Sequence, residues 1–269
     1  LIKLDVLGLA TLDLLDSAKR YIKESTGKDI NLDAIPLDDR KVLDGFAAGY
    51  TQGVFQLESG PMRKLLKDLG GGIEPMSFKT IVATTALFRP GPIQSGMLDD
   101  YVAVAKGFMP PQSLHPVLDE LTAETNGVIL YQEQTMNATR LLAGFTMAEA
   151  DGVRKAIGKK DMEKMKSMGE KFIVQAQAGW IDVVMEDGTA QRIHRAEHFK
   201  CEDGKLRTVE EALDAGVKLP MAVVSVTGSH PGLSETKASE IWQAFEKNGA
   251  YQFNKSHSVA YSLISYQSM

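Results

Sequence analysis

Two sets of side chains in this sequence could do chemistry on a phosphate. The first set is Asp5 and Lys3, which lie two apart in the apolar run of residues 1–7, typical of a β-strand, so both leave the same strand face. A carboxylate at a strand end suits Mg²⁺, because this ion takes one or two carboxylates together with phosphate oxygens. The alternative to metal binding is a solvated Asp5 on an edge strand, paired with Lys3. Spacing alone favours this alternative.

The second set is the most cationic stretch of the chain. Between residues 152 and 171, seven lysines and arginines stand against three acidic residues, although the whole chain has a net charge of −5. Such a patch can hold a triphosphate or a nucleic-acid backbone. A solvated helix face with i,i+4 ion pairs is the alternative. It explains the residues after Asp161 better than it explains these four cations: Arg154, Lys155, Lys159 and Lys160.

A polar cluster near the end of the chain is a weaker candidate. Asn254, Lys255 and His257 lie beside the aromatic residues Phe253 and Tyr261. Such side chains can each bond a phosphate, a sugar or a base edge. The start of a helix looks similar, with a polar residue as its N-cap, and a lone histidine more often packs or hydrogen-bonds than catalyses.

Composition excludes several classes of protein. The chain has 269 residues, of which 43% are hydrophobic and 24% charged, so a disordered tail, a collagen-like fibre and a coiled-coil rod are excluded. No run approaches the roughly 20 apolar residues of a membrane span. The single cysteine, Cys201, excludes a disulfide framework and a cysteine-built zinc site, so we expect a reducing, cytoplasmic setting.

The two ends of the sequence indicate an internal piece of a longer protein. The first residue is Leu1 inside a strand-like run, and the last nine residues form an amphipathic pattern with no helix stop signal. Natural termini more often fray into polar residues. We therefore expect any active site to be incomplete within this sequence.

Hydrophobic periodicity predicts a mainly helical (α+β) fold. Apolar residues at helical spacing predict helices over residues 9–25, 77–87, 147–157 and 161–177. Residues 51–58 suggest a short strand, and the Pro-Gly-Pro run at residues 90–92 predicts a rigid turn. From residue 181 the sequence pattern changes from helical to strand-like. Alternating apolar and polar residues and an Asp-Gly turn at Asp187 predict a β-rich segment over about 181–231.

Six segments in a fixed order carry a resemblance to a known family. They resemble the bacterial C-family replicative DNA polymerases, the family of the catalytic alpha subunit of DNA polymerase III. The resemblance covers about residues 1–178 and 232–269. Each motif is modest alone, but six in the family's order are specific. The segments are residues 3–9 (KLDVLGL), 53–59 (GVFQLES), 86–97 (ALFRPGPIQSGM), 129–134 (ILYQEQ), 154–160 (RKAIGKK) and 253–258 (FNKSHS).

The resemblance implies a fold and its domains. Residues 1–8 would be the end of the palm domain, including its last strand, and residues 9–180 the first part of a helical fingers domain. Residues 181–231 would be a β-rich insertion, and residues 232–269 the continued, truncated fingers domain. Cellular members of the family normally lack this segment. We interpret it as a surface insertion, such as a lineage-specific one from a phage or mobile element. The second interpretation is the degenerate remnant of an intein.

The resemblance also implies roles for the candidate residues. Asp5 matches the third of three acids that hold two Mg²⁺ ions; the first two belong to an Asp-x-Asp segment absent from this sequence. Lys3 matches a lysine near the triphosphate, and Arg154 and Lys155 match a basic pair that reaches the nucleotide phosphates. Lys155 stands where the family usually has arginine, so the bidentate fork is lost. Substrate or structural roles are implied for these motif positions: Lys159, Lys160, Arg89, Asn254, Lys255 and His257.

The function implied is template-directed DNA synthesis by nucleotidyl transfer from a dNTP to a primer 3′-hydroxyl. The implied partners are primer–template DNA, the incoming dNTP and, in the intact protein, the sliding clamp and other replisome subunits, with no membrane. Because two metal ligands are missing, we expect this piece alone to be inactive. One alternative is a non-catalytic nucleic-acid-binding or replisome-docking module; a metal-dependent phosphohydrolase is weaker, because it needs a second acid or histidine near Asp5.

Overall fold

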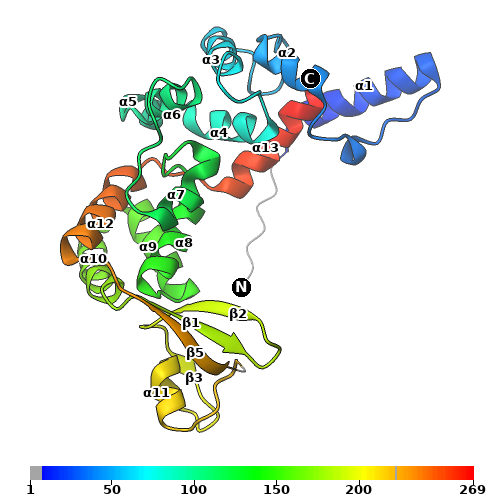
Figure 1. Ribbon diagram of the computed structural model, residues 1–269. Coiled ribbons are helices and arrows are strands. Elements are labelled where there is room, and N and C mark those ends of the chain that lie inside the picture. Colours follow the sequence, from blue (N-terminus) through cyan, green and yellow to red (C-terminus); the bar gives the residue numbers. More distant parts are fainter. Residues whose placement is uncertain (1–7, 222) are drawn as a thin grey trace. The chain divides into compact units, whose positions relative to one another are not determined.

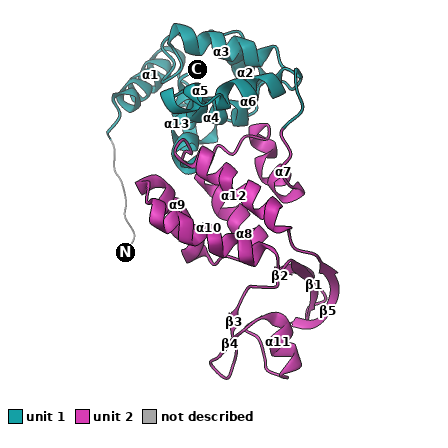
Figure 2. Cartoon of the chain, turned by 90° about the vertical axis from the view of Figure 1, so that its left-hand side faces the viewer, with its two compact units in different colours: residues 1–111, 254–269 teal, residues 112–253 magenta. Residues whose placement is uncertain are grey.

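Helices form most of the structure, a computed structural model that describes residues 8–221 and 223–269. Over this part of the chain, 13 α-helices and a small antiparallel sheet confirm the mainly helical fold class. The strand predicted for residues 1–7 lies outside the described residues. The chain divides into two compact units, which Figure 2 shows in different colours: unit 1 has residues 1–111 and 254–269, and unit 2 has residues 112–253. The predicted limits of the domains stay a prediction.

The helices of unit 1 begin and end at ordinary sequence signals. The first helix ends at Gly27, whose φ of 69° is left-handed and whose N–H bonds the Lys23 carbonyl. Ser59 caps another helix by accepting from the Met62 N–H. The elements are α1 (Ala10–Thr26), η1 (Leu32–Ala34), α2 (Arg40–Ala47), α3 (Gly60–Gly70), α4 (Phe78–Leu87), α5 (Pro90–Gln94), α6 (Met97–Ala105) and α13 (Lys255–Ser268).

The core of unit 1 forms around the pairing of α4 with α13, which lie side by side in Figure 1. At one end, the Phe78 ring packs edge-on against Tyr266, with 5.8 Å between the ring centroids. Further along, the buried Ser258 hydroxyl donates to the Val82 carbonyl at 2.7 Å. These contacts run in opposite directions along the two helices, so the pair is antiparallel. The end of α4 therefore lies at the same end of the pair as the start of α13.

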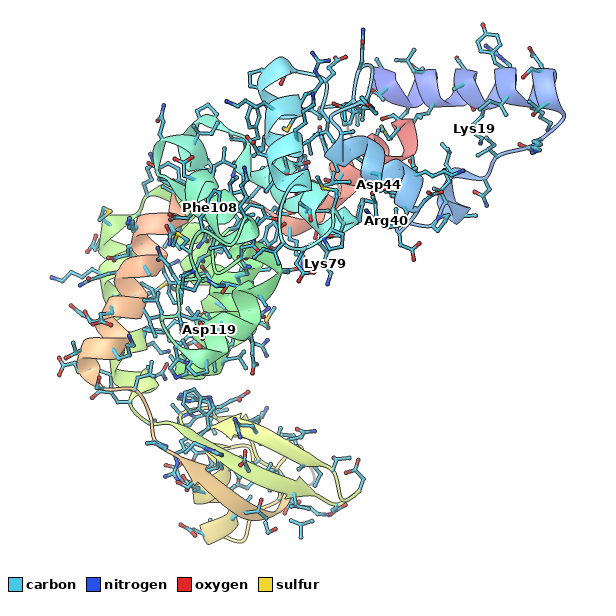
Figure 3. All side chains as sticks on the ribbon, turned by 45° about the horizontal axis from the view of Figure 1, so that its top comes forward. Lys19, Arg40, Asp44, Lys79, Phe108 and Asp119 are labelled. Atoms are coloured by element: carbon cyan, nitrogen blue, oxygen red, sulfur yellow. The ribbon has the colours of Figure 1, made fainter. Side chains whose placement is uncertain are left out.

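An arginine ties α2 to the start of α4. Arg40 donates to the Met76 carbonyl at 2.9 Å and pairs with Asp44 one turn along its own helix. Figure 3 shows Arg40 and Asp44 next to each other on α2. Both side chains are about half exposed, so the ion pair adds little to stability and mainly orients the guanidinium toward the carbonyl.

The helices of unit 2 pack around an aromatic cluster. Phe172 lies 5.4 Å from Trp242 and 5.7 Å from Phe245, measured between ring centroids, and all three side chains are buried. Because aromatic side chains bury a large apolar area, this cluster is the centre of the helical core. The elements are α7 (Pro116–Thr122), η2 (Ala123–Thr125), α8 (Gln132–Ala143), α9 (Met147–Lys159), α10 (Met162–Ala176) and α12 (Glu235–Gly249).

A small β-structure lies between α10 and α12 in the sequence. Its three-stranded antiparallel sheet has the order β2 (Ala190–His194), β1 (Trp180–Met185), β5 (Val223–His230). Two further short strands, β3 (Phe199–Lys200) and β4 (Leu206–Arg207), pair with each other, and α11 (Val209–Asp214) follows them. One face of the sheet packs onto α11 through a separate apolar core of Ile181, Val183, Ile193 and Val209.

The chain leaves the helical body and returns to it through a narrow neck of two glycines. A Cβ atom on Gly179 would lie 2.2 Å from the His230 carbonyl oxygen, and one on Gly232 would lie 2.1 Å from the Gln177 carbonyl oxygen. Real Cβ atoms essentially never come so close to backbone, so both positions require glycine. The first strand of the sheet starts and the last one ends at this neck.

Two local predictions were wrong. Residues 51–58 form successive turns rather than a strand: the Thr51 hydroxyl donates to the Leu57 carbonyl at 2.6 Å, and Gln56 has a φ of 62°. The run at residues 90–92 does not stop the chain in a rigid turn but starts α5, with Pro90 in its first turn. Proline is well suited to that position, because its fixed φ is helical and its missing N–H would be unpaired there.

Candidate functional site

The predicted cations of unit 2 lie on the solvent face and at the end of α9. The helix starts with a capping box in which Thr146 and Glu149 satisfy each other's backbone N–H groups. Val153, Ala156 and Ile157 are buried in the helical core, so the residues between them face solvent. The cations on this solvent side are Arg154, which is half-buried, and the exposed Lys155 and Lys159.

A single carboxylate holds the basic pair. Arg154 donates to Asp151 Oδ1 from Nε at 2.8 Å and from Nη2 at 2.7 Å, and the Lys155 ammonium lies 2.6 Å from Asp151 Oδ2. Hydrogen bonds from Lys155 and Arg154 lower the pKa of the Asp151 carboxyl. The two cations are therefore gathered at one place on the helix surface, and their charge is partly balanced there.

The end of α9 carries the other two predicted cations. Lys159 is the last helical residue, and Lys160 follows with a left-handed φ of 54°, its N–H bonding the Ile157 carbonyl. Asp161 then caps α10 by accepting from the Lys164 N–H at 3.1 Å. Lysines at a helix C-terminus also balance its partial negative charge, so part of this charge has a local structural use.

The predicted residues of unit 1 lie at the common end of α4 and α13. Arg89 is the second residue after the end of α4. It donates from Nε to the Ala86 carbonyl at 2.7 Å. Asn254 caps α13 by accepting from the His257 N–H at 2.8 Å, as the N-cap alternative predicts. The His257 ring packs on Tyr261 with 4.3 Å between centroids. Lys255 is the first residue of the same helix.

The structure thus brings the predicted residues together in two groups. Arg154, Lys155, Lys159 and Lys160 form one group on α9, and Arg89, Asn254, Lys255 and His257 form another at the end of the α4–α13 pair. Asp5 and Lys3 lie outside the described residues. The roles expected for Asp5 and Lys3 therefore stay predictions.

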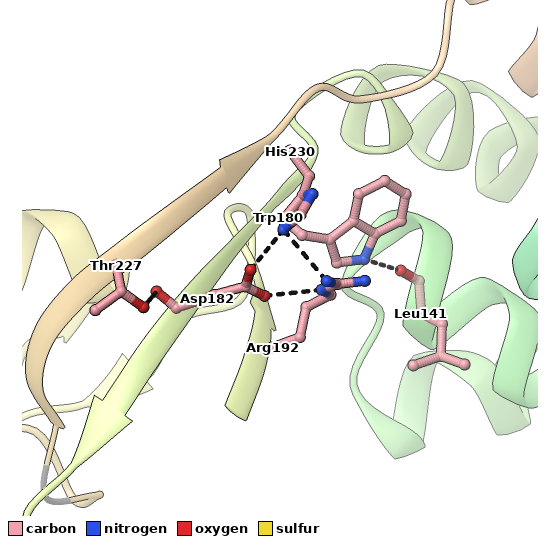
Figure 4. A network of polar contacts seen from close by, with 6 residues as sticks. All are labelled: Leu141, Trp180, Asp182, Arg192, Thr227 and His230. Carbon is pink, nitrogen blue, oxygen red and sulfur yellow. Dashed lines mark hydrogen bonds and ion pairs between the residues drawn. The ribbon is translucent and has the colours of Figure 1, made fainter. Parts of the chain in front are cut away.

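A third polar cluster, which the sequence did not indicate, lies on the face of the sheet opposite α11. Asp182 accepts from Arg192 Nε at 2.9 Å and pairs with His230 Nε2 at 2.6 Å (Figure 4). A Cβ on Gly228 would lie 2.7 Å from the Asp182 carboxylate, so glycine leaves the room that this carboxylate occupies. Hydrogen bonds from Arg192 and His230 lower the pKa of Asp182.

Two ring N–H groups fix the sheet to the end of α8. Trp180 Nε1 donates to the Leu141 carbonyl (Figure 4), and His194 Nε2 lies 3.0 Å from the Leu142 carbonyl. Helix-terminal carbonyls have no partner inside the helix, so these donors satisfy them. Burial lowers the pKa of His194 to about 4, and the ring is neutral at pH 7.

A pocket of about 460 Å³ lies where the sheet meets α7 and α8. Arg140 and Arg192 line it, but so do the carboxylates of Glu120 and Glu197, so it has no excess of cations for a phosphate. Burial raises the pKa of the Glu197 carboxyl. We therefore place the candidate phosphate site on α9 and not in this pocket.

Metal and membrane signals are absent from the described part of the chain. Among residues 8–221 and 223–269, no group of three or more His, Cys, Asp or Glu side chains is arranged to hold a metal ion. Nor does any helix formed by these residues combine the length and the apolar character of a membrane span.

Sequence reasoning gave no role to Asp151, although a signal was present. An acidic residue three and four positions before two cations lies on the same helix face as both, and such spacing predicts intrahelical pairs. The expectation that intrahelical ion pairs explain Arg154 and Lys155 poorly was therefore wrong. The Asp182 cluster had no comparable signal, because its members lie 10 and 48 residues apart in the sequence.

Comparison with known proteins places these features in a family. Residues 11–179 match the family model of the bacterial DNA polymerase III alpha subunit finger domain, and this match ends at the glycine neck before β1. A protein named DNA polymerase III subunit alpha from Yersinia pestis is 94% identical over 269 residues, which is all of this chain and 23% of that protein.

More distant relatives have the same name. The proteins from Aquifex aeolicus (strain VF5) and Thermus aquaticus are 40% and 33% identical to the chain. Each alignment covers 99% of this chain and 18% of the relative. The chain therefore spans about a fifth of the length of these relatives. Because the Yersinia alignment includes residues 181–231, the β-rich segment has a counterpart in that bacterial protein.

Proposed function

The chain belongs to the bacterial DNA polymerase III alpha subunit finger domain family, and we propose that its α9 cations bind the triphosphate of an incoming dNTP during DNA synthesis. The observation that carries this proposal is the arrangement of Arg154 and Lys155, gathered on the solvent side of α9 by one carboxylate. The names of the relatives support the reaction class, since each is a DNA polymerase III subunit alpha.

The chemistry of α9 suits this role. A dNTP carries a triphosphate whose negative charge grows on the leaving pyrophosphate during nucleotidyl transfer, so fixed cations stabilise the reacting state. Arg154 supplies a planar guanidinium and Lys155 a compact ammonium, and both make charge-assisted bonds to phosphate oxygens. Lys159 and Lys160 extend the positive surface past the end of the helix. Base pairing with the template, and not these residues, selects the nucleotide.

The residues of unit 1 are proposed as a second group of contacts. Lys255 and Arg89 add two further cations at the end of the α4–α13 pair, and Asn254 and His257 hold the first turn of α13. The His257 ring is tilted against Tyr261, so this end of the helix also carries two aromatic rings in contact. We propose that these side chains contact substrate or fix the backbone that does.

Metal chemistry is proposed for the intact protein and not for the described residues. Two Mg²⁺ ions would lower the pKa of the primer hydroxyl and stabilise the leaving pyrophosphate. The described residues contain no group of three or more potential metal ligands, and Asp5, the proposed third carboxylate, lies outside that part of the chain. What this chain supplies is phosphate binding and positioning.

The proposal extends to partners and to the organisation of the chain. We infer primer–template DNA, a sliding clamp and other replisome subunits as partners of the intact protein, and a cytoplasmic location. We also propose that residues 1–8 end the palm, that residues 9–180 and 232–269 are fingers, and that residues 181–231 are an insertion. The glycine neck and the end of the family match at residue 179 support the insertion.

Binding of dATP to the 269-residue chain tests the proposed function. Replacing both cations (R154A/K155A) should weaken binding by at least about tenfold, because charge-assisted bonds to phosphate are lost. Lys166→Ala is the matched control: it removes a charge from α10 in the same cationic stretch without touching the pair. Equal affinities of the double variant and the control for dATP, measured by calorimetry, would contradict the proposal.

A further inference from the structure

Gly158 lies inside α9 without a contact that would require glycine. Its position is exposed, and a Cβ placed there would meet nothing within 4 Å. Three other helix glycines are explained by close contacts, since a Cβ on each would lie under 3.0 Å from backbone or from a buried side chain. The distances are 2.6 Å for Gly70, 2.5 Å for Gly169 and 2.6 Å for Gly249.

Backbone conformation does not explain Gly158 either. Gly158 is the twelfth residue of α9 and does not have a positive φ, so any residue could adopt its conformation. Glycine destabilises a helix relative to alanine, because it loses more backbone freedom on folding. Within the protein itself, therefore, neither of the two ordinary reasons for glycine applies at this position.

The residue that follows the helix shows the opposite departure. Lys160 has a left-handed φ of 54°, at the position after a helix where glycine or asparagine is usual. Glycine thus stands where the fold does not need it, and a lysine stands where glycine would be favoured. Departures from local preference without a compensating contact are expected at functional sites.

The surroundings of Gly158 indicate what the free space is for. Arg154 and Lys155 lie four and three residues earlier on the helix, and Lys159 is the next residue. Side chains in an α-helix lean toward its N-terminus, so a side chain at position 158 would extend over the preceding turn, beside the basic pair. With glycine there, the helix backbone next to these cations is bare.

We propose that Gly158 is a positioning residue that lets a phosphate group of a triphosphate approach the α9 backbone between the basic pair and Lys159. This inference rests on the proposed function and adds to it the residue that sets how closely the phosphate comes. Glycine at position 158 leaves the turn between the basic pair and Lys159 open to a phosphate that binds Arg154 and Lys155. Lysines that merely balance the helix end explain the charge of this region but not the glycine.

Gly158→Ala tests the inference, and the open space around the position ensures that the variant folds. Binding of inorganic tripolyphosphate to the 269-residue chain is measured by calorimetry, and thermal unfolding is followed by circular dichroism. We expect about tenfold weaker tripolyphosphate binding together with an increased Tm, because alanine favours the helix while its methyl group holds the phosphate off. A purely structural role for Gly158 cannot weaken binding in a more stable protein.

Gly60→Ala is the matched control, because Gly60 also lies in a helix with nothing within 4 Å of its Cβ. It should leave tripolyphosphate binding unchanged. If G158A binds as tightly as G60A while R154A/K155A binds weakly, the inference is overturned and the proposed function stands. If the double variant binds tripolyphosphate normally, or the unaltered chain does not bind it, the proposed function fails and the inference fails with it.

Discussion

The carboxylate of Asp151 lies 2.6 Å from the ammonium of Lys155, one turn further along the exposed side of α9. The same carboxylate accepts two hydrogen bonds from Arg154. A phosphate that binds this basic pair must therefore compete with an anion that the protein already provides. Asp151 holds the cations together before the ligand arrives and also reduces their net charge.

Asp151→Asn should strengthen the binding of tripolyphosphate by about threefold, since removing a carboxylate that is one-third exposed releases the partly screened charge of its two partners. Asp161→Asn is the control, because it removes the same charge from the same stretch and asparagine caps α10 equally well. Titration calorimetry at constant ionic strength compares the two variants. Equal gains would mean that only net charge matters, and weaker binding of D151N would mean that the pair needs its carboxylate.

Acidification should destabilise the contact between the sheet and α8 through His194. Its Nδ1 accepts from the Ala196 N–H at 3.1 Å, so the proton sits on Nε2, which bonds the Leu142 carbonyl, and a second proton has no acceptor. Burial lowers the pKa to about 4 from the usual 6.5. The unfolded chain then binds more protons between these values, so the free energy of unfolding decreases as the pH is lowered, by about 1–2 kcal/mol from pH 7 to pH 5.

Urea unfolding at several pH values measures this effect. In His194→Gln the amide can still donate to the Leu142 carbonyl but does not titrate, so its free energy of unfolding should depend less on pH over this range. His115, whose pKa burial also lowers, remains in both proteins and contributes equally to both slopes. Identical slopes for the unaltered chain and H194Q would exclude His194 as the source.

Gln134→Ala should lower the free energy of unfolding by about 3 kcal/mol, because several buried backbone and side-chain groups lose their partner. The Gln134 side chain is 5% exposed and makes four hydrogen bonds: it accepts from the Leu130 and Tyr131 N–H groups at 2.8 and 2.7 Å and donates to the Leu121 carbonyl and to Thr125. Gln132→Ala, two residues earlier in the same motif and partly exposed, should cost far less. Comparable losses in denaturant titrations would refute this role for Gln134.

The 269-residue chain should give no primer extension. Only Asp5 of the three proposed metal-binding acids belongs to this sequence, and the described residues contain no cluster of three or more potential metal ligands. A primer–template with all four dNTPs and Mg²⁺, analysed on a denaturing gel, is the assay. Incorporation of even one nucleotide, absent when R154A/K155A replaces the unaltered chain, would show that the chain needs no further acids.

Helices were predictable from the sequence because each combines an apolar period with a local stop or start signal. The predicted helix over residues 9–25 is α1, closed by Gly27, and that over 161–177 is α10. Residues 51–58 were predicted wrongly because short apolar runs look alike whether they form a strand or a series of turns. Only the hydrogen bond of the Thr51 hydroxyl and the left-handed Gln56, both tertiary features, decide between them.

The candidate site was predictable as a set of cations but not as an arrangement. Charge excess and the order of the motifs indicate Arg154 and Lys155, because these are properties of the sequence alone. The pairing with Asp151, the open space at Gly158 and the structural use of Gln134 depend on which helix face is buried. A motif residue can thus be structural, as Gln134 is. A residue outside the motifs, such as Asp151, can hold the residues of the candidate site in place.

Because of the glycine neck at Gly179 and Gly232, the segment that forms the sheet can be removed and the two ends of the remaining chain joined. Because the outgoing and returning strands touch at this point, joining residue 179 to residue 232 spans a gap that the backbone already nearly closes. The packed rings of Phe172, Trp242 and Phe245 all lie on the helical side of that joint. A lineage could therefore gain or discard the whole sheet in one genetic event and keep the helical core intact.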